Sequence, residues 1–137
     1  MAIRQVRAVN VERARNLLVQ AVLDRKDAST LTISPYRRLT AAYEASLHCC
    51  LAVLALSREE ASGSEGHHRE IIERACEILS LQKQAGELLA ISKIRNGVQY
   101  KGAYAVDEQT IGQTIKLADR MLAETESWVR RHQPYAL

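Results

Sequence analysis

Several residue types that shape many globular proteins are scarce in this chain. Among its 137 residues there is no phenylalanine, one tryptophan, two prolines and six glycines, whereas 47% of the residues are apolar and 26% are charged. This composition excludes a disordered or fibrous protein. The excess of Ala, Leu, Glu and Arg over Val, Ile and Tyr favours helix over sheet. The length predicts a single domain, residues 1–137, with a sizeable core.

Cysteines and long apolar runs are also few. The three cysteines, two of them adjacent, provide neither a disulfide framework nor the ligand spacing of a zinc site. No uninterrupted apolar run reaches the ~20 residues that a membrane span needs, and the basic N-terminus lacks the apolar segment of a secretory signal. We therefore expect a cytoplasmic protein without metal or cofactor, in which Cys49, Cys50 and Cys76 are reduced and buried.

The net charge of +3 is small but unevenly distributed. Residues 1–38 contain eight Lys or Arg against three Asp or Glu, residues 39–92 four against eight, and residues 93–137 seven against five. A basic N-terminal third can help to attract phosphate, and the alternative is an ordinary solvated helix face.

Helical periodicity runs through almost the whole sequence in about five segments. The first starts at Val6 or Val11, with Asn10 as an alternative cap, and ends at Lys26; Leu17, Leu18, Ala21 and Val22 are expected to face inward. The second starts at Ser34 as N-cap with Pro35 at the first helical position. The others cover about His67 to Leu79, about Leu81 to Val98, and Asp107 to the region before Pro134. "SREEASGSEG" predicts an exposed loop. The fold predicted is an all-α, up-and-down bundle.

In the second segment Tyr36, Leu39, Tyr43, Leu47, Cys50 and Leu54 follow one apolar stripe, and the two tyrosines are expected to be core residues whose hydroxyls reach polar partners. The fourth segment has an anomaly. Leu88, Ile91, Arg95 and Val98 lie on one stripe, so Arg95 points where the core packing points. A buried guanidinium needs an acidic partner, a polar cleft or a second subunit. Asn96 and Gly97 are poor helix formers beside it, which favours a site over packing.

"IRNGVQYKG" resembles the end of the signature helix of HEPN domains, small helical bundles of prokaryotic toxin–antitoxin and defence systems. "PYRRLTAAYEASLHCCLAVLAL" is similar to the family's second helix, and "SGSEGHHREIIERACEIL" to the entry of its next helix; together they cover about residues 34–102. In active members the resemblance implies a homodimer that cleaves RNA without metal, with an arginine and a histidine from each subunit at the scissile phosphate. The arginine stabilises charge at phosphorus and the histidine moves a proton.

This chain departs from that pattern. Four residues separate Arg95 from Tyr100, so a phenol occupies the position of the motif histidine, and no histidine occurs from residue 69 to residue 131. Tyrosine titrates near pH 10 and is a poor base at neutral pH, although it can donate a hydrogen bond to phosphate. His67 and His68, at the start of a helix where anions are favoured, could complete a phosphate site if that helix end approaches Arg95. Further candidate phosphate contacts are Asn96, Arg37, Arg38 and Tyr104.

Three functions remain open. The first is a binding module, a HEPN-like homodimer that holds RNA or a nucleotide phosphate at Arg95, Asn96 and Tyr100 without fast turnover. The second is a metal-independent endoribonuclease toxin in which Arg95 acts with Tyr100, His67 or His68. The third is a protein–protein adaptor or antitoxin in which Arg95 pairs with an acid such as Glu44 or Glu77; a cognate toxin, antitoxin or nucleotidyltransferase would be the partner.

Overall fold

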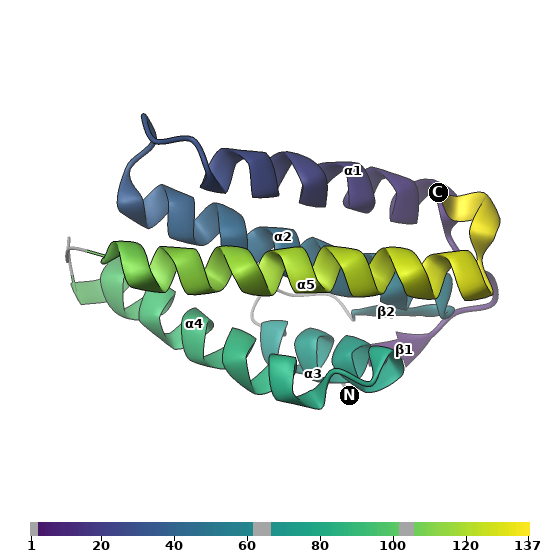
Figure 1. The fold of residues 1–137 in the computed structure, drawn as a ribbon. Helices are drawn as coiled ribbons and strands as arrows, with labels where there is room; N and C mark the ends of the chain where they lie inside the picture. The colour runs from purple at the N-terminus through teal and green to yellow at the C-terminus, as the bar shows by residue number, and fades with distance from the viewer. Residues whose placement is uncertain (1–2, 62–66, 102–105) are drawn as a thin grey trace.

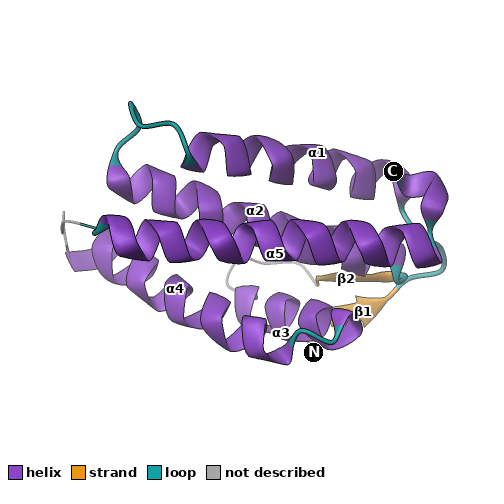
Figure 2. Ribbon diagram, in the orientation of Figure 1, coloured by secondary structure: helices purple, strands orange, loops and turns teal. Residues whose placement is uncertain are grey.

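The described residues form a bundle of five helices with a two-stranded sheet at one end (Figures 1 and 2). The computed structural model describes residues 3–61, 67–101 and 106–137, without the side chains of residues 99–101. The helices are α1 (Val11–Ala28), α2 (Pro35–Leu56), α3 (His68–Leu79), α4 (Gln82–Lys101) and α5 (Glu108–His132), and a 3₁₀ turn covers Pro134–Ala136. The prediction of an all-α bundle of about five helices is confirmed.

The helix starts follow the capping residues. The side chains of Asn10, Ser34 and Asp107 accept hydrogen bonds from the backbone N–H three residues further on, at 3.0, 3.4 and 2.7 Å. Each cap satisfies one of the donors that a helix start leaves unpaired. Of the two starts predicted for α1, the later one at Val11 is correct. Helix α4 continues to Lys101, three residues beyond the predicted end.

Helix α2 is the centre of the core. It packs against α1, α5, α3 and α4, and its stripe of Leu39, Tyr43, Leu47, Cys50 and Leu54 is buried. The three cysteines are free and buried, as expected, and burial raises the pKa of Cys49 to about 12, so its thiol stays protonated at neutral pH.

Although polar and charged residues interrupt its apolar sequence, α2 is a candidate membrane span by a less strict criterion. This helix, Pro35–Leu56, is long and apolar enough by length and composition alone, with a mean hydropathy of 1.5 over its most apolar window. In the bundle, 72% of that window is buried, which is also typical of the core helix of a globular domain.

The segment after α2 is not simply a loop. Strand β1 (Ile3–Gln5) pairs antiparallel with strand β2 (Glu59–Ala61), and Glu59 is buried. The prediction of an exposed loop is therefore wrong for these three residues, and residues 62–66 of that loop lie outside the described residues. Arg74 of α3 donates hydrogen bonds to both carboxylate oxygens of Glu59, at 2.7 and 2.9 Å, and this pairing compensates the burial of the charge. This ion pair joins the sheet to α3.

Candidate functional site at Arg95

The anomalous stripe of α4 faces inward, as its spacing predicts. Leu88 is fully buried, Ile91 is 8% exposed, and the side chain of Arg95 is 19% exposed. Helix α4 runs antiparallel to α2, so the C-terminal half of α4 lies alongside the N-terminal half of α2 (Figure 1). Arg95 thereby meets Tyr43 and Glu44 in the third turn of α2.

The guanidinium of Arg95 is only partly satisfied by the protein. Its Cζ lies 5.5 Å from the centre of the Tyr43 ring, within the range of a cation–π interaction. Its Nη2 lies 4.0 Å from Oε1 of Glu44, which is beyond hydrogen-bond distance. Its Nε is buried and has no hydrogen-bond acceptor among the described residues. A buried N–H donor without an acceptor is costly, so the contacts of Arg95 with the described residues leave part of its hydrogen-bonding capacity unused.

An imidazole reaches the same tyrosine. Nδ1 of His68, at the start of α3, lies 3.1 Å from the hydroxyl oxygen of Tyr43, and the two ring centres are 6.0 Å apart. Ser92 of α4 also hydrogen-bonds to that hydroxyl. The consistent assignment has Ser92 donating to Tyr43 and Tyr43 donating to Nδ1 of a neutral His68. Arg95, Tyr43, His68, Ser92 and Glu44, from three helices, form what we call the Arg95 cluster.

The charges in this cluster act on one another. Burial, and then the positive charge of Arg95, lower the pKa of His68, so the imidazole is neutral at pH 7. Burial raises the pKa of Tyr43, while the hydrogen bond from Ser92 and the charge of Arg95 lower it in part. The one unprotonated nitrogen of this neutral imidazole is the Nδ1 that receives the Tyr43 hydroxyl, so accepting another proton requires that contact to break, and a buried phenol is not a base at neutral pH.

The lowered pKa predicts a specific pH dependence. As the pH falls below about 6.5, the unfolded chain binds a proton at His68 before the folded protein does, so the free energy of unfolding should fall until the folded pKa is passed. Arg95→Met should raise the pKa of His68 towards its ordinary value without reaching it, because burial is the larger cause. Titration of the His68 ring resonances, assigned with His68→Gln, measures this. An unchanged pKa in Arg95→Met would contradict the proximity of the two groups.

The other candidates are distributed around the cluster. Arg37 is exposed and lies seven residues, about two helical turns, before Glu44 on the same face of α2. His67 occupies the N-cap position of α3 without a side-chain capping bond, and its Nδ1 lies 4.0 Å from Glu70. Asn96 is exposed next to Arg95. Tyr100 belongs to α4, but its side chain, like the whole of Tyr104, lies outside the described residues.

Arg38 has a structural role instead of facing the cluster. It is 7% exposed, its Nε donates to the carbonyl of Ala28 at 2.9 Å, and its Nη1 lies 2.9 Å from Glu108. These contacts tie the end of α1 and the start of α5 to α2. Because Nε and Nη1 of Arg38 already donate to these partners and the side chain is buried, we remove Arg38 from the candidate phosphate contacts. Glu77 is likewise removed as a partner of Arg95, because it pairs with Arg74 at 2.5 Å.

A second polar pair lies between α1 and α2. Asp24 of α1 is 5% exposed; its Oδ2 lies 2.6 Å from Nδ1 of His48, and its Oδ1 accepts from Gln20 at 2.8 Å. His48 follows Glu44 by one turn of α2, so this pair and the Arg95 cluster are neighbours along the helix. Asp24 could not be identified from its spacing alone, because its buried position shows only when α1 is packed on α2.

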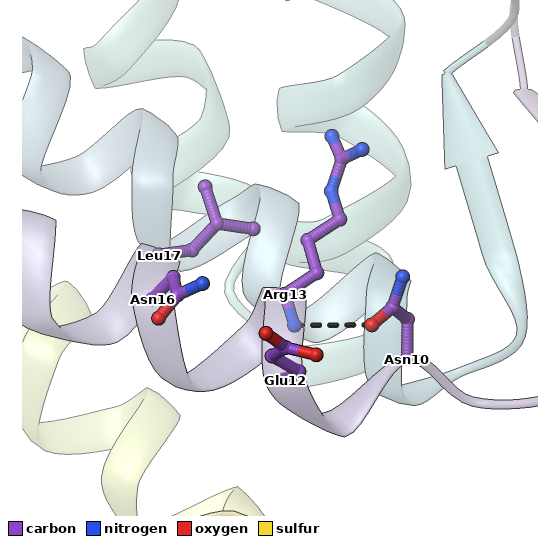
Figure 3. A pocket seen from close by; sticks show the side chains of 5 residues that line it. All are labelled: Asn10, Glu12, Arg13, Asn16 and Leu17. Carbon is purple, nitrogen blue, oxygen red and sulfur yellow. Dashed lines mark hydrogen bonds between the residues drawn. The ribbon is translucent and has the colours of Figure 1, made fainter.

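The hollow beside the N-terminus of α1 does not form a comparable site (Figure 3). It measures about 420 Å³ and is lined by Asn10, Glu12, Arg13, Asn16 and Leu17. The side-chain oxygen of Asn10 is occupied by capping the backbone of Arg13, and the Arg13 guanidinium points away from Asn10 and Glu12 (Figure 3). The described residues of its lining include no imidazole, thiol or paired carboxylates, so they lack the groups for acid–base chemistry.

Comparison of the chain with protein-family models, with curated proteins and with solved structures finds no match. The case for a function therefore rests on the Arg95 cluster itself. Of its five members, Arg95 and His68 were candidates from the sequence, and Glu44 was named there as an acidic partner. Tyr43 was predicted to be a core residue with a polar partner, which is confirmed. Ser92 was not predicted. It lies three residues before Arg95 on the same side of α4, and this spacing is the feature of the sequence that could have identified it.

Proposed function

We propose that this protein is a HEPN-like homodimer that binds RNA or a nucleotide phosphate through Arg95, without efficient catalysis, in a cytoplasmic toxin–antitoxin or defence system. The observation that carries the proposal is the buried Nε of Arg95, which has no acceptor among the described residues. A phosphate oxygen is the acceptor that a guanidinium fork binds best. Tyr43 holds the guanidinium in place from one side, which reduces the conformational entropy lost on binding.

Weak catalysis follows from the same contacts. His68 shares its Nδ1 with the Tyr43 hydroxyl, and Glu44 places a carboxylate near the position that a phosphate would take. A carboxylate beside an anion opposes binding and offsets part of the attraction from Arg95. This arrangement favours reversible binding over rapid turnover.

Arg95→Ala is expected to weaken binding of a labelled single-stranded oligoribonucleotide, or of ATP, by about tenfold to hundredfold, the value of a hydrogen bond to a charged group. The slope of log affinity against log salt should fall by about one, because one phosphate contact is lost. Arg95→Lys keeps the positive charge but lacks the paired donors of the guanidinium, so its affinity should lie between those of wild type and Arg95→Ala. Fluorescence anisotropy across a salt series measures all three. Equal affinity and equal slope for wild type and Arg95→Ala would remove the proposal.

Glu44→Gln is the matched test of the adaptor alternative, in which Arg95 serves only as a partner of Glu44. Removing the carboxylate should tighten phosphate binding a few-fold, because it removes the nearest competing anion. If the contact at 4.0 Å is only a structural strut, the same variant should lower stability and leave binding unchanged.

The endoribonuclease alternative is supported by a different observation, the neutral imidazole of His68 next to Arg95. His68 would then replace the histidine missing from the motif as the proton acceptor. Purified protein incubated with single-stranded and structured RNA in the presence of a chelator should produce cuts that disappear in both Arg95→Ala and His68→Gln. Intact RNA at high protein concentration would exclude this activity.

A further inference from the structure

Arg95 is not alone in having a buried polar atom without a partner. The hydroxyl oxygens of Thr40 and Ser46, both on α2, are also buried and have no hydrogen-bond partner among the described residues. A buried hydroxyl without a partner costs free energy, as an unpaired N–H does. Whether either hydroxyl belongs with Arg95 depends on its direction around α2.

Thr40 lies on the side of α2 that faces Arg95. Arg95 contacts Tyr43 and Glu44, which point about 100° apart around the helix. Thr40 points between them, about 60° from Tyr43 and about 40° from Glu44, one turn closer to the start of α2. Because α4 runs antiparallel to α2, the turn of α4 that follows Arg95 lies alongside this turn of α2 (Figure 1). Nε of Arg95 and Oγ1 of Thr40 therefore share one sector between the two helices.

These two atoms call for an anion with several oxygens. Nε–H of Arg95 only donates, and the hydroxyl of Thr40 can donate as well, so a ligand that satisfies both must present acceptors. The charge of Arg95 favours an anionic acceptor. The guanidinium can turn towards such a ligand, because the nearest acid, Glu44, lies 4.0 Å from Nη2 and accepts no hydrogen bond from it.

The depth of the two atoms selects which part of a ligand reaches them. Both are buried between packed helices, although Thr40 and Arg95 are each partly exposed as residues. An internal phosphodiester carries a ribose on both sides and has two free oxygens, so it remains at the surface. A terminal phosphate has one ester bond and three acceptor oxygens, and it can enter end-on. Its second negative charge also offsets the repulsion from Glu44.

We propose that Thr40 and Arg95 together bind a terminal phosphate, the monoester at the end of a nucleotide or of an RNA strand, in preference to an internal phosphodiester. This inference rests on the proposed function and narrows its ligand to one chemical class. The hydroxyl of Thr40 donates to one phosphate oxygen and the guanidinium of Arg95 to the others. Arg37, exposed and three residues before Thr40, adds a second positive charge at the outer edge of the site.

Ligands that differ only in a terminal phosphate test the ligand class. In fluorescence anisotropy, a 3′-labelled oligoribonucleotide with a 5′-phosphate should bind at least about tenfold tighter than the same strand with a 5′-hydroxyl, and AMP should compete about tenfold better than adenosine. A preference within the AMP pair alone identifies a free nucleotide as the ligand, and a preference within the oligonucleotide pair identifies an RNA end. Equal affinity within both pairs would overturn the proposal.

Thr40→Val tests the residue. Valine has nearly the shape of threonine without the hydroxyl, so affinity for the phosphorylated ligand should fall about tenfold, while affinity for the ligand without phosphate should not change. Thr40→Ser keeps a hydroxyl and should bind like wild type. Ser46→Ala is the matched control: it removes another buried, unpaired hydroxyl of α2, on the other side of Tyr43, and should leave binding unchanged. An unchanged affinity in Thr40→Val would exclude Thr40 from the site.

Stability and the Arg95 variant separate the possible failures. Because the Thr40 hydroxyl has no partner in the protein, Thr40→Val should melt at the wild-type temperature or above it. A lower melting temperature would show that the hydroxyl is already paired and would contradict the proposal. If Arg95→Ala weakens binding while Thr40→Val and the terminal phosphate have no effect, the proposed function stands and this inference fails. If Arg95→Ala binds like wild type, both fail.

Discussion

Arg74→Met is expected to lower the free energy of unfolding by about 3 kcal/mol. Glu59 is 7% exposed, and both its oxygens are bound by Arg74. Breaking a buried pair by removing one partner typically costs about 3–5 kcal/mol, because the other charge stays buried without compensation. The lower end applies here because the Arg74 side chain is 37% exposed and water screens part of the interaction. Urea denaturation followed by circular dichroism measures the loss.

The double variant Glu59→Gln with Arg74→Met is the control for this mechanism. It removes the buried charge together with its partner, so most of the lost stability should return. If the double variant is as unstable as Arg74→Met, the loss comes from packing of the arginine stem, and the charge argument is wrong. Because Arg74 lies in the helix that begins at His68, Arg74→Met should also disturb the contact between His68 and Tyr43.

Local signals in the sequence predicted the helices well. Ser34 with Pro35, and Asp107, each combine a capping side chain with the start of an apolar stripe, and α2 and α5 begin there. The two short strands were not predictable in this way. Each has three residues, too few to show an alternating pattern, and they pair across more than fifty positions of the chain. Glu59 looked like part of a charged loop because its partner Arg74 lies in another element.

The same difference between signals within one helix and contacts between elements applies to the candidate site. Arg95 could be predicted because a charge in an apolar stripe conflicts with its neighbours on a single helix, and the structure confirms that it points inward. The contact of His68 with Tyr43 joins residues 25 positions apart on different helices, so it depends on the packing of α3 against α2. Val22 shows the opposite error, since it is 58% exposed. A regular apolar spacing was assigned to the core, although periodicity identifies a face without saying what covers that face.

His48→Leu is expected to lower the free energy of unfolding by about 3–5 kcal/mol, the largest effect predicted for a single change. The Asp24 side chain is 7% exposed and that of His48 is 22% exposed, so solvent screens this pair less than it screens Glu59 and Arg74. Without the imidazole, Asp24 keeps only the amide of Gln20 as a hydrogen-bond donor among the described side chains. Urea denaturation of the single variant His48→Leu and of the double variant Asp24→Asn with His48→Leu measures the cost of the buried charge. The double variant has no charge at position 24, so it should regain most of the lost stability.

His48→Gln separates this structural role from a part in ligand binding. Glutamine can donate a hydrogen bond to Asp24 in place of Nδ1, so this variant should retain more stability than His48→Leu. Because Asp24 holds His48 against α1, whereas Glu44 one turn earlier lies near Arg95, the oligoribonucleotide affinity of folded His48→Gln should equal that of wild type. A loss comparable to that of Arg95→Ala would show instead that the bound strand extends along α2 as far as His48, and the binding surface would then have to include both polar clusters.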